Sequence, residues 1–203
     1  MPDAPDQRPR RTALPASGDT EAGLFTLPNL ITLGRLFAVP AAVWLMLQHR
    51  HDIAFMVFVG AGISDALDGW IARVWNARSA LGALLDPIAD KALLVSVYVT
   101  LAAMNVLPDW LAILVVFRDL LIVGGVILLW VLGVPARIKP LLISKANTAA
   151  QIALAALVLF LSGWRFSAPF LLETMILLVA VTTFASGAAY VVQAARLTAT
   201  GAK

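Results

Sequence analysis

Residues 64–91 read SDALDGWIARVWNARSALGALLDPIADK, and this stretch contains four aspartates in two closely spaced pairs. Asp65 and Asp68 lie three residues apart in its first half, and Asp86 and Asp90 lie four apart in its second half. Because a helix turns by about 100° per residue, each pair falls on one side of its helix. A short connection between the halves makes the two helices antiparallel neighbours, so we expect the two acidic stripes to face each other.

Strongly apolar sequence surrounds this stretch on both sides. The chain has 203 residues, of which 61% are hydrophobic and only 13% are charged, and its mean hydropathy is +0.88. Soluble domains are about 45–50% apolar and about a quarter charged, so the composition indicates an integral membrane protein. A spanning helix needs about 20 mainly apolar residues. We therefore predict an all-α integral membrane protein with six transmembrane helices.

Short polar turns, several with Gly or Pro, divide the six predicted spans. The spans cover residues 29–48, 53–75, 82–104, 110–132, 144–162 and 168–194. We expect them to form one catalytic membrane domain over residues 25–197. Residues 1–24 are rich in Pro, Asp, Arg and Gly without apolar periodicity, which predicts a disordered cytoplasmic tail. Residues 198–203 are expected to form a short C-terminal tail.

The charge distribution predicts the partners and the orientation. The net charge is +3 and there is no cysteine, which excludes disulfides and thiolate metal sites. The basic residues flank apolar spans, so we expect membrane lipids rather than nucleic acid as partners. Most of them fall in the first tail and in the connections after spans two and four. The positive-inside rule then places both termini and the acidic stripes in the cytoplasm, and we expect a bacterial inner (plasma) membrane protein.

Four carboxylates beside a membrane require compensating charge. Insertion of one charged side chain near the bilayer centre costs about 2.5–3.5 kcal/mol, less toward the interface, and four acids also repel one another. Only Arg73 and Lys91 are close in sequence. Two divalent cations would supply the missing charge, and ligation by oxygen alone favours Mg²⁺ or Mn²⁺. A single aspartate pair could instead be a helix cap or an interfacial pair, but two matched stripes favour a metal site.

The residues between the acids fit a bulky anionic substrate. Gly69, Ala72 and Gly82 leave room for a nucleotide to approach the backbone. Arg73 offers a planar guanidinium for phosphate. Two metal ions can hold a pyrophosphate and stabilise a leaving phosphate, while one carboxylate acts as a general base for an attacking hydroxyl.

This pattern resembles a known family signature. The spacing Asp65-x2-Asp68-Gly69-x2-Ala72-Arg73-x8-Gly82-x3-Asp86-x3-Asp90 is similar at every position and gap to that of the CDP-alcohol phosphotransferases, also called class I CDP-alcohol phosphatidyltransferases. The resemblance implies a homodimeric six-helix fold whose site opens to the cytoplasmic leaflet.

The same resemblance implies roles for individual residues. Asp65, Asp68 and Asp86 would bind the metals, and Asp90 would contact metal and act as the base. Gly69, Arg73 and Ser79 would contact the CDP-linked lipid. Asn29 and Thr32, in Pro28-Asn29-x2-Thr32-x2-Arg35, resemble the family's first-helix segment beside the nucleotide.

The acceptor alcohol is suggested by two further segments. Residues 86–91 resemble the glycerophosphate and cardiolipin branches of the family, and residues 139–151 resemble the mitochondrial-type cardiolipin synthases, as does Arg118-Asp119 followed by Gly124-Gly125. We therefore expect transfer from CDP-diacylglycerol to phosphatidylglycerol, giving cardiolipin and CMP. Phosphatidylglycerophosphate synthesis from glycerol 3-phosphate is the alternative, because the later segment is loosely shared with those enzymes.

For four charged residues, the sequence allows two interpretations. Lys139 and Lys145 would bind the acceptor phosphate or anchor a helix end to lipid. Arg118 and Asp119 lie near the middle of the fourth span, where each should pair with another helix, either as a structural bridge or as a substrate contact. Glu173 is expected at the interface.

Two other classes of function are compatible with an acidic site in a membrane. Intramembrane prenyl transfer also binds pyrophosphate through metal-bridged aspartates, and it predicts activity on prenyl diphosphates. A small divalent-cation transporter predicts metal flux without release of CMP. An assay with labelled CDP-diacylglycerol distinguishes a prenyl transferase and a cation transporter from the expected transferase.

Overall fold

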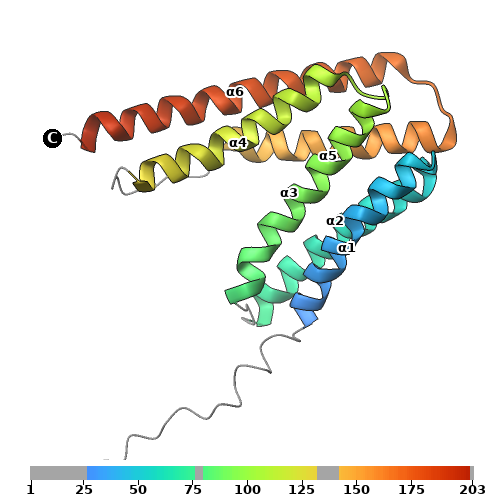
Figure 1. Cartoon of the computed structure of the whole chain (residues 1–203), viewed down its shortest axis with the longest axis horizontal. Helices are drawn as coiled ribbons and strands as arrows, with labels where there is room; N and C mark the ends of the chain where they lie inside the picture. The colour runs from blue at the N-terminus through green and yellow to red at the C-terminus, as the bar shows by residue number, and fades with distance from the viewer. Residues whose placement is uncertain (1–26, 76–79, 132–141, 202–203) are drawn as a thin grey trace, which may run out of the picture.

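The computed structural model describes residues 27–75, 80–131 and 142–201, with side chains described for residues 33–65, 67, 89–129, 131 and 142–196. This part of the chain folds into six helices (Figure 1). They are α1 (Leu27–Leu47), α2 (His51–Trp75), α3 (Ala80–Ala103), α4 (Asp109–Val131), α5 (Leu142–Trp164) and α6 (Pro169–Gly201). The predicted all-α fold with six helices is confirmed, and five of the six helices begin slightly before their predicted starts. Helix α6 continues to Gly201, well past its predicted end.

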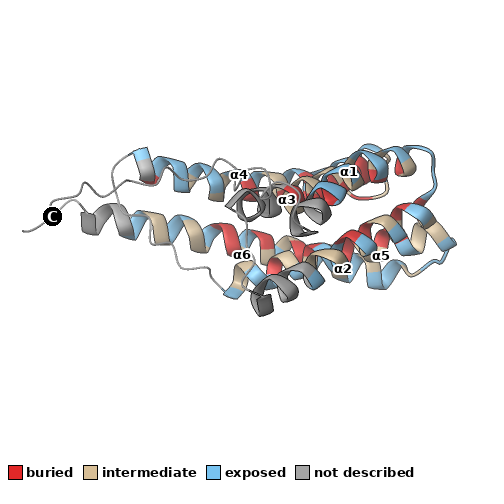
Figure 2. Cartoon of the chain, turned by 90° about the horizontal axis from the view of Figure 1, so that it is seen from below, coloured by how far each residue is buried: buried red, intermediate tan, exposed pale blue. Residues whose placement is uncertain are grey.

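In the described part of the chain, three helices are long and apolar enough to cross a bilayer. These segments are Asp109–Leu129, Leu142–Trp164 and Pro169–Arg196, and a shorter apolar segment covers Leu33–Leu47. Large hydrophobic side chains such as Trp44, Phe117 and Phe184 are exposed. Figure 2 colours exposed residues of every kind pale blue, and they occur along all the helices. Exposed apolar side chains of this kind are suited to contact with the hydrocarbon chains of a lipid bilayer.

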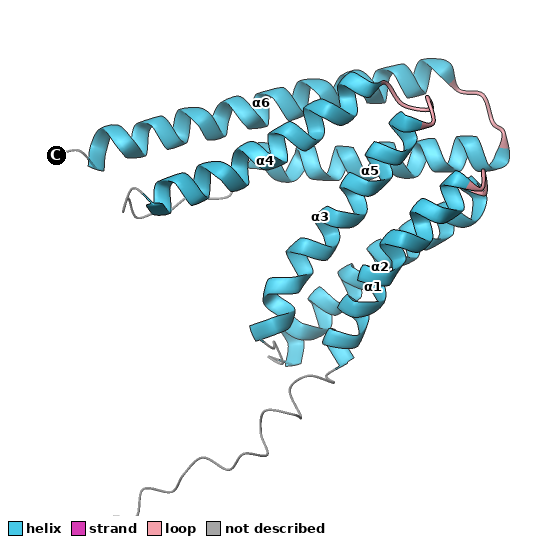
Figure 3. Cartoon of the chain, viewed as in Figure 1, coloured by secondary structure: helices cyan, strands magenta, loops and turns pink. Residues whose placement is uncertain are grey.

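The three described turns share one hydrogen-bond design. Each contains one residue in the left-handed conformation: His49 (φ 57°), Asn105 (φ 58°) and Arg165 (φ 56°). The following N–H donates to the carbonyl five residues earlier, as in the bonds from Arg50 to Leu45, from Val106 to Leu101 and from Phe166 to Leu161, each 2.9 Å long. This is the Schellman pattern that satisfies carbonyls at a helix end. It stops α1, α3 and α5 at the same end of the molecule (Figure 3).

Gly163 lies inside α5 and not in the following turn, where the sequence had suggested it. A Cβ at this position would lie 2.6 Å from the backbone nitrogen of Asp52 and 2.8 Å from its Cα. Glycine therefore permits the end of α5 to touch the start of α2. Phe55, Phe160 and Trp164 pack around this contact with ring centroids 5.0–5.6 Å apart. The turn itself begins at Arg165.

The helices converge near these turns and diverge toward the opposite end (Figure 1). Helix α1 packs against both α2 and α3, α5 packs against α2 and α6, and α4 packs against α6 and α3. All six helices contribute to one buried cluster, which includes Met46, Phe58, Tyr98, Leu111, Leu154 and Val179. Within the described residues, α2 and α3 make no extensive contact of their own. Helix α1 packs against both of them.

Candidate active site

The acidic stretch lies on α2 and α3 as the spacing predicted. Asp65 and Asp68 fall in the second half of α2, and Asp86 and Asp90 fall in the first half of α3. Asp65 and Asp90 are the two members of this set whose side chains are described. These two show whether the stripes meet.

Asp65 and Asp90 meet at one nitrogen of Arg35, a residue of α1. Arg35 Nη1 lies 3.0 Å from Asp65 Oδ1 and donates a hydrogen bond of 2.7 Å to Asp90 Oδ1. The arginine side chain is only 2% exposed, whereas both carboxylates are 44% exposed. Charge-assisted hydrogen bonds of this length are among the stronger ones in proteins. A buried guanidinium on α1 therefore links the two acidic helices, and both carboxylates keep an open side.

The role of Arg35 was not expected from the sequence. The sequence pattern indicated only Arg73 and Lys91 as positive charges close to the acids, and Arg35 was part of the first-helix motif without a role of its own. Arg35 does carry a signal, because a charged residue inside an apolar helix is costly and so usually has a partner or a function. The apolar pattern of α1 does not reveal which neighbour that partner belongs to, since α1 has apolar residues on all sides.

A pocket of about 240 Å³ lies beside this contact, between α1 and α2. Its lining is made of Gly34, Arg35, Ala38, Val57, Ala61 and Ser64. Four of these six residues are Gly, Ala or Ser, so small side chains create the space. Ligand pockets usually measure about 300–1,000 Å³. This pocket alone can therefore accommodate only part of a nucleotide-linked lipid.

The other predicted site residues are placed less completely. The side chains of Asp68, Gly69, Ala72, Arg73, Ser79, Gly82, Asp86, Asn29, Thr32 and Lys139 lie outside the described ones. Lys145 is exposed in the first turn of α5. Among the described side chains, no three potential metal ligands gather in one group. The described part of the site thus contains one carboxylate from each acidic helix and the arginine that joins them.

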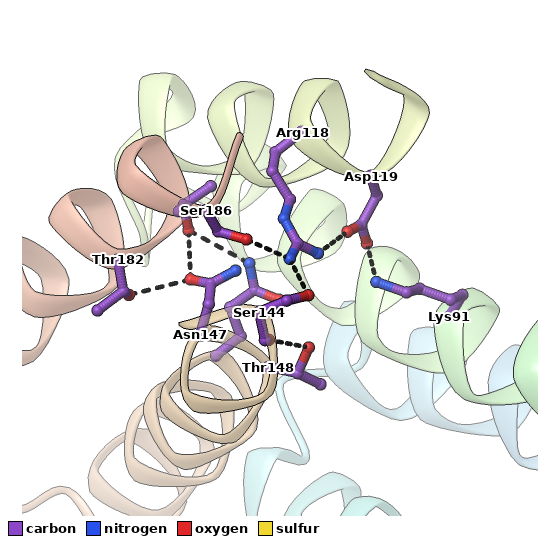
Figure 4. A network of polar contacts seen from close by, with 10 residues as sticks. Lys91, Arg118, Asp119, Ser144, Asn147, Thr148, Thr182 and Ser186 are labelled. Carbon is purple, nitrogen blue, oxygen red and sulfur yellow. Dashed lines mark hydrogen bonds and ion pairs between the residues drawn. The ribbon is translucent and has the colours of Figure 1, made fainter. Parts of the chain in front are cut away.

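A second polar cluster lies between α3 and α4 (Figure 4). Lys91 Nζ donates to Asp119 Oδ2 at 2.6 Å, and Arg118 Nη1 donates to Asp119 Oδ1 at 2.8 Å. The side chain of Asp119 is 10% exposed. The described ionic contact of Lys91 is therefore with Asp119 of α4.

Arg118 is fixed by groups on three helices. Its Nη2 donates to the hydroxyl of Ser144 on α5 at 2.5 Å and to that of Ser186 on α6 at 2.6 Å. The guanidinium carbon also lies 5.9 Å from the ring centroid of Tyr190. The prediction that Arg118 and Asp119 each contact another helix is confirmed. Their direct bond to each other was not predicted.

Neutral hydrogen bonds extend this cluster along α5 and α6. Asn147 Oδ1 accepts from the hydroxyls of Thr182 at 3.0 Å and Thr183 at 2.8 Å, and Gln151 Nε2 donates to Thr183 Oγ1 at 3.3 Å. Such side-chain contacts between helices support packing where lipid provides no hydrophobic driving force. Glu173, in contrast, is exposed near the start of α6, in agreement with an interfacial position.

Comparison with known proteins adds a family match to this geometry. The model of the CDP-alcohol phosphatidyltransferase family matches residues 25–195. The match therefore includes all six helices through most of α6, and it contains both polar clusters described above.

Individual relatives agree with the family match. Human cardiolipin synthase (CMP-forming) is 35% identical over 182 residues, which cover 82% of this chain and 60% of the human protein. A chloroplastic CDP-diacylglycerol–glycerol-3-phosphate 3-phosphatidyltransferase of Oryza sativa is 35% identical over 177 residues, covering 76% of this chain and 54% of that protein. A putative cardiolipin synthase of Mycobacterium tuberculosis is 36% identical over 118 residues, with 58% and 56% covered. The chain thus spans less than two thirds of each of these relatives.

Proposed function

The chain belongs to the CDP-alcohol phosphatidyltransferase family, and we propose that it transfers a phosphatidyl group from CDP-diacylglycerol to phosphatidylglycerol, giving cardiolipin and CMP. The observation that carries this proposal is the convergence of Asp65 and Asp90, from two different helices, on Arg35. Each acidic helix thus contributes a half-exposed carboxylate to the same contact. The relatives named cardiolipin synthase support the choice of acceptor.

The four aspartates would hold two divalent cations, Mg²⁺ or Mn²⁺. Their carboxylate oxygens are the donor type that these hard cations prefer, and the two described carboxylates are open on one side, as metal ligation requires. When bound, such ions polarise the phosphorus and neutralise the charge of the departing phosphate. Asp65, Asp68 and Asp86 would serve as ligands, and Asp90 would share this role.

Asp90 is also proposed as the general base. It takes the proton of the acceptor hydroxyl as that oxygen forms a bond to the lipid-side phosphorus. The bond between this phosphorus and the oxygen of CMP breaks at the same time, so CMP carries away the electron pair. Arg35 orients the Asp90 carboxylate through its 2.7 Å hydrogen bond. Positioning and preorganised charge supply most of the acceleration in reactions of this kind.

The remaining predicted residues would bind the two substrates. Gly69, Ala72 and Gly82 would give the nucleotide close access to the backbone, and Arg73 and Ser79 would contact its phosphates. Asn29 and Thr32 would lie beside the nucleotide. Lys139 and Lys145 would attract the acceptor phosphate from the start of α5. The small-residue pocket next to Arg35 would hold one group of the CDP-linked lipid.

We propose that this site faces the cytoplasm in a bacterial inner membrane and that the protein is a homodimer. The described turns, with Arg50 and Arg165, lie at one end of the helices (Figure 3). The connections richest in basic residues belong to the opposite end, which the positive-inside rule assigns to the cytoplasm. Asp65 and Asp90 lie in the halves of α2 and α3 nearer that end.

Synthesis of phosphatidylglycerophosphate is the second candidate, and the plant relative that uses glycerol 3-phosphate favours it. The test is purified protein in lipid vesicles with labelled CDP-diacylglycerol and Mg²⁺ or Mn²⁺. Phosphatidylglycerol, glycerol 3-phosphate and inositol phosphate are offered in separate reactions. Cardiolipin and an equal amount of CMP are expected with phosphatidylglycerol alone.

Other outcomes of the same assay lead to other conclusions. Product formed only with glycerol 3-phosphate would transfer the assignment to the second candidate. Release of no CMP with any acceptor, together with Mg²⁺ or Mn²⁺ flux across the vesicle membrane, would indicate a transporter. Activity on prenyl diphosphates in place of CDP-diacylglycerol would indicate intramembrane prenyl transfer.

A further inference from the structure

One turn of α3 is held by two neighbouring helices at once. Asp90 accepts a hydrogen bond from Arg35 of α1, and the next residue, Lys91, forms an ion pair with Asp119 of α4. Consecutive side chains on a helix point about 100° apart. The two contacts therefore reach α3 from different directions, at the position of the proposed base.

The contact on the α4 side is itself firmly anchored. Asp119 uses one oxygen for Lys91 and the other for Arg118. Arg118 is fixed by the hydroxyls of Ser144 and Ser186, and its side chain is 4% exposed. Figure 4 shows this chain of contacts running from α3 through α4 to α5 and α6. The position of Lys91 is thus tied to three other helices.

A small rotation of α3 would displace the proposed base considerably. A side-chain end about 5–6 Å from the helix axis moves by about 1 Å when the helix turns by about 10°. Catalytic groups need to stay within about 0.5 Å of their productive position. Holding α3 at both Asp90 and Lys91 resists this rotation.

We propose that Asp119 is a positioning residue for phosphatidyl transfer: by holding Lys91, it sets the rotation of α3 and hence the location of the Asp90 carboxylate. The inference rests on the proposed function. Direct binding of an acceptor phosphate by Asp119 is disfavoured, because both of its oxygens already meet cations and its negative charge would repel the phosphate.

The test compares Asp119→Asn with a matched control in the same bundle. Thr183→Val removes buried hydrogen bonds to Asn147 and Gln151 without touching Lys91 or Arg118. Both variants are prepared as full chains in vesicles, and kcat, KM for each substrate, Tm and Mn²⁺ affinity are measured. Asp119→Asn should lower kcat at saturating metal by about 10- to 100-fold, the usual effect of losing a supporting partner of a metal-site residue. Its Mn²⁺ affinity should fall as well, and KM for both lipids should stay within about twofold of wild type.

Three further variants identify the contact through which the effect is transmitted. Lys91→Met should reproduce the loss in kcat, and the Lys91→Met/Asp119→Asn double variant should be no worse than either single variant, because both changes break one link. Asp119→Glu, which keeps the charge, should recover part of the activity. Thr183→Val should lower Tm while leaving kcat and Mn²⁺ affinity unchanged.

The inference would be overturned by a normal kcat in Asp119→Asn, or by a loss in kcat that Thr183→Val reproduces at the same Tm. A rise in KM for the acceptor with kcat unchanged would also overturn it and would make Asp119 part of an acceptor site. If wild-type protein releases no CMP with any acceptor, the proposed function fails. Mn²⁺ affinity then decides the inference alone: weaker binding in Asp119→Asn than in Thr183→Val supports it, and equal binding overturns it.

Discussion

Arg35 and Arg118 are both almost fully buried arginines that bond aspartates, yet their surroundings differ. Arg118 contacts one aspartate that is 10% exposed, and neutral hydroxyls from two other helices occupy its Nη2. Among the described side chains, Arg35 contacts two aspartates, each 44% exposed, which come from two different helices. Together with Lys91, the cluster of Arg118 and Asp119 has one positive charge in excess. The cluster of Arg35, Asp65 and Asp90 has one negative charge in excess.

This difference separates structural polar groups from groups available to a ligand. Buried charges are tolerated where protein groups compensate them, as they do around Arg118. Around Arg35 the excess is negative and one side of each carboxylate remains accessible, and Asp68 and Asp86 add further acids on the same two helices. A cation is the natural complement of such a site. The two clusters should therefore respond differently to metal and to mutation.

The largest effect is expected for Asp90→Asn. This change removes the proposed base from the cluster of Arg35, Asp65 and Asp90 and keeps the shape of the side chain. General base catalysis contributes about 10²- to 10⁴-fold, so kcat for CMP release should fall by this factor. KM for CDP-diacylglycerol should change little. Near-normal turnover in this variant would rule out Asp90 as the base, and a large rise in KM would make it a binding residue instead.

Arg35→Met should have an intermediate effect, seen first in stability. Charge-assisted hydrogen bonds contribute about 1.5–3 kcal/mol. Because both carboxylates are half-exposed, solvent reduces this to about 1–2 kcal/mol, and Tm falls by roughly 2–4 °C per kcal/mol. Without the guanidinium the acids repel one another more strongly, so saturating Mg²⁺ should raise Tm more in the variant than in wild type. Equal Mg²⁺ shifts of Tm in calorimetry would show that Arg35 and the metal ions do not balance the charge of the same acids.

Gly34→Ala should have the smallest effect and tests the pocket beside the cluster of Arg35, Asp65 and Asp90. A methyl group at this position meets no described atom within 4 Å beyond its chain neighbours and the backbone of its own helix, and alanine favours the helix by about 0.5–1 kcal/mol. The protein should therefore become slightly more stable. If the pocket holds part of the CDP-linked lipid, KM for that lipid should rise by up to about tenfold. This is the lower end of the discrimination that one methylene group produces in a binding pocket. An unchanged KM would remove the pocket from the substrate site.

The sequence was a good guide to local structure. Apolar segments of sufficient length predicted six helices, and the spacing of Asp65, Asp68, Asp86 and Asp90 placed each pair correctly on α2 or α3. Asn105 and Arg165, which have the left-handed conformation in two of the turns, fall in the gaps between the predicted spans. The positions of the helices and of the residues on them depend on residues close together in the chain. The periodic pattern of the sequence is therefore enough to predict them.

Contacts between distant helices could not be predicted in the same way. In an apolar helix such as α1, no polar stripe indicates the inner face, so the contact of Arg35 with both acidic helices depends on packing alone. The bond between Arg118 and Asp119 was missed because neighbouring residues on a helix point apart, whereas a long arginine side chain can bend back to its neighbour. Gly163 was taken for a turn residue because its close approach to Asp52 involves another helix.

The central claim is that the aspartates of α2 and α3 jointly hold divalent cations at which phosphatidyl transfer takes place. Crystals grown with Mn²⁺ and measured at the manganese edge test this most directly. The account predicts two anomalous peaks between α2 and α3, in direct contact with Asp65 and Asp90 oxygens, both of which disappear or weaken in Asp65→Asn. Peaks located elsewhere in the molecule, or none between α2 and α3 in protein that is active with Mn²⁺, would contradict it.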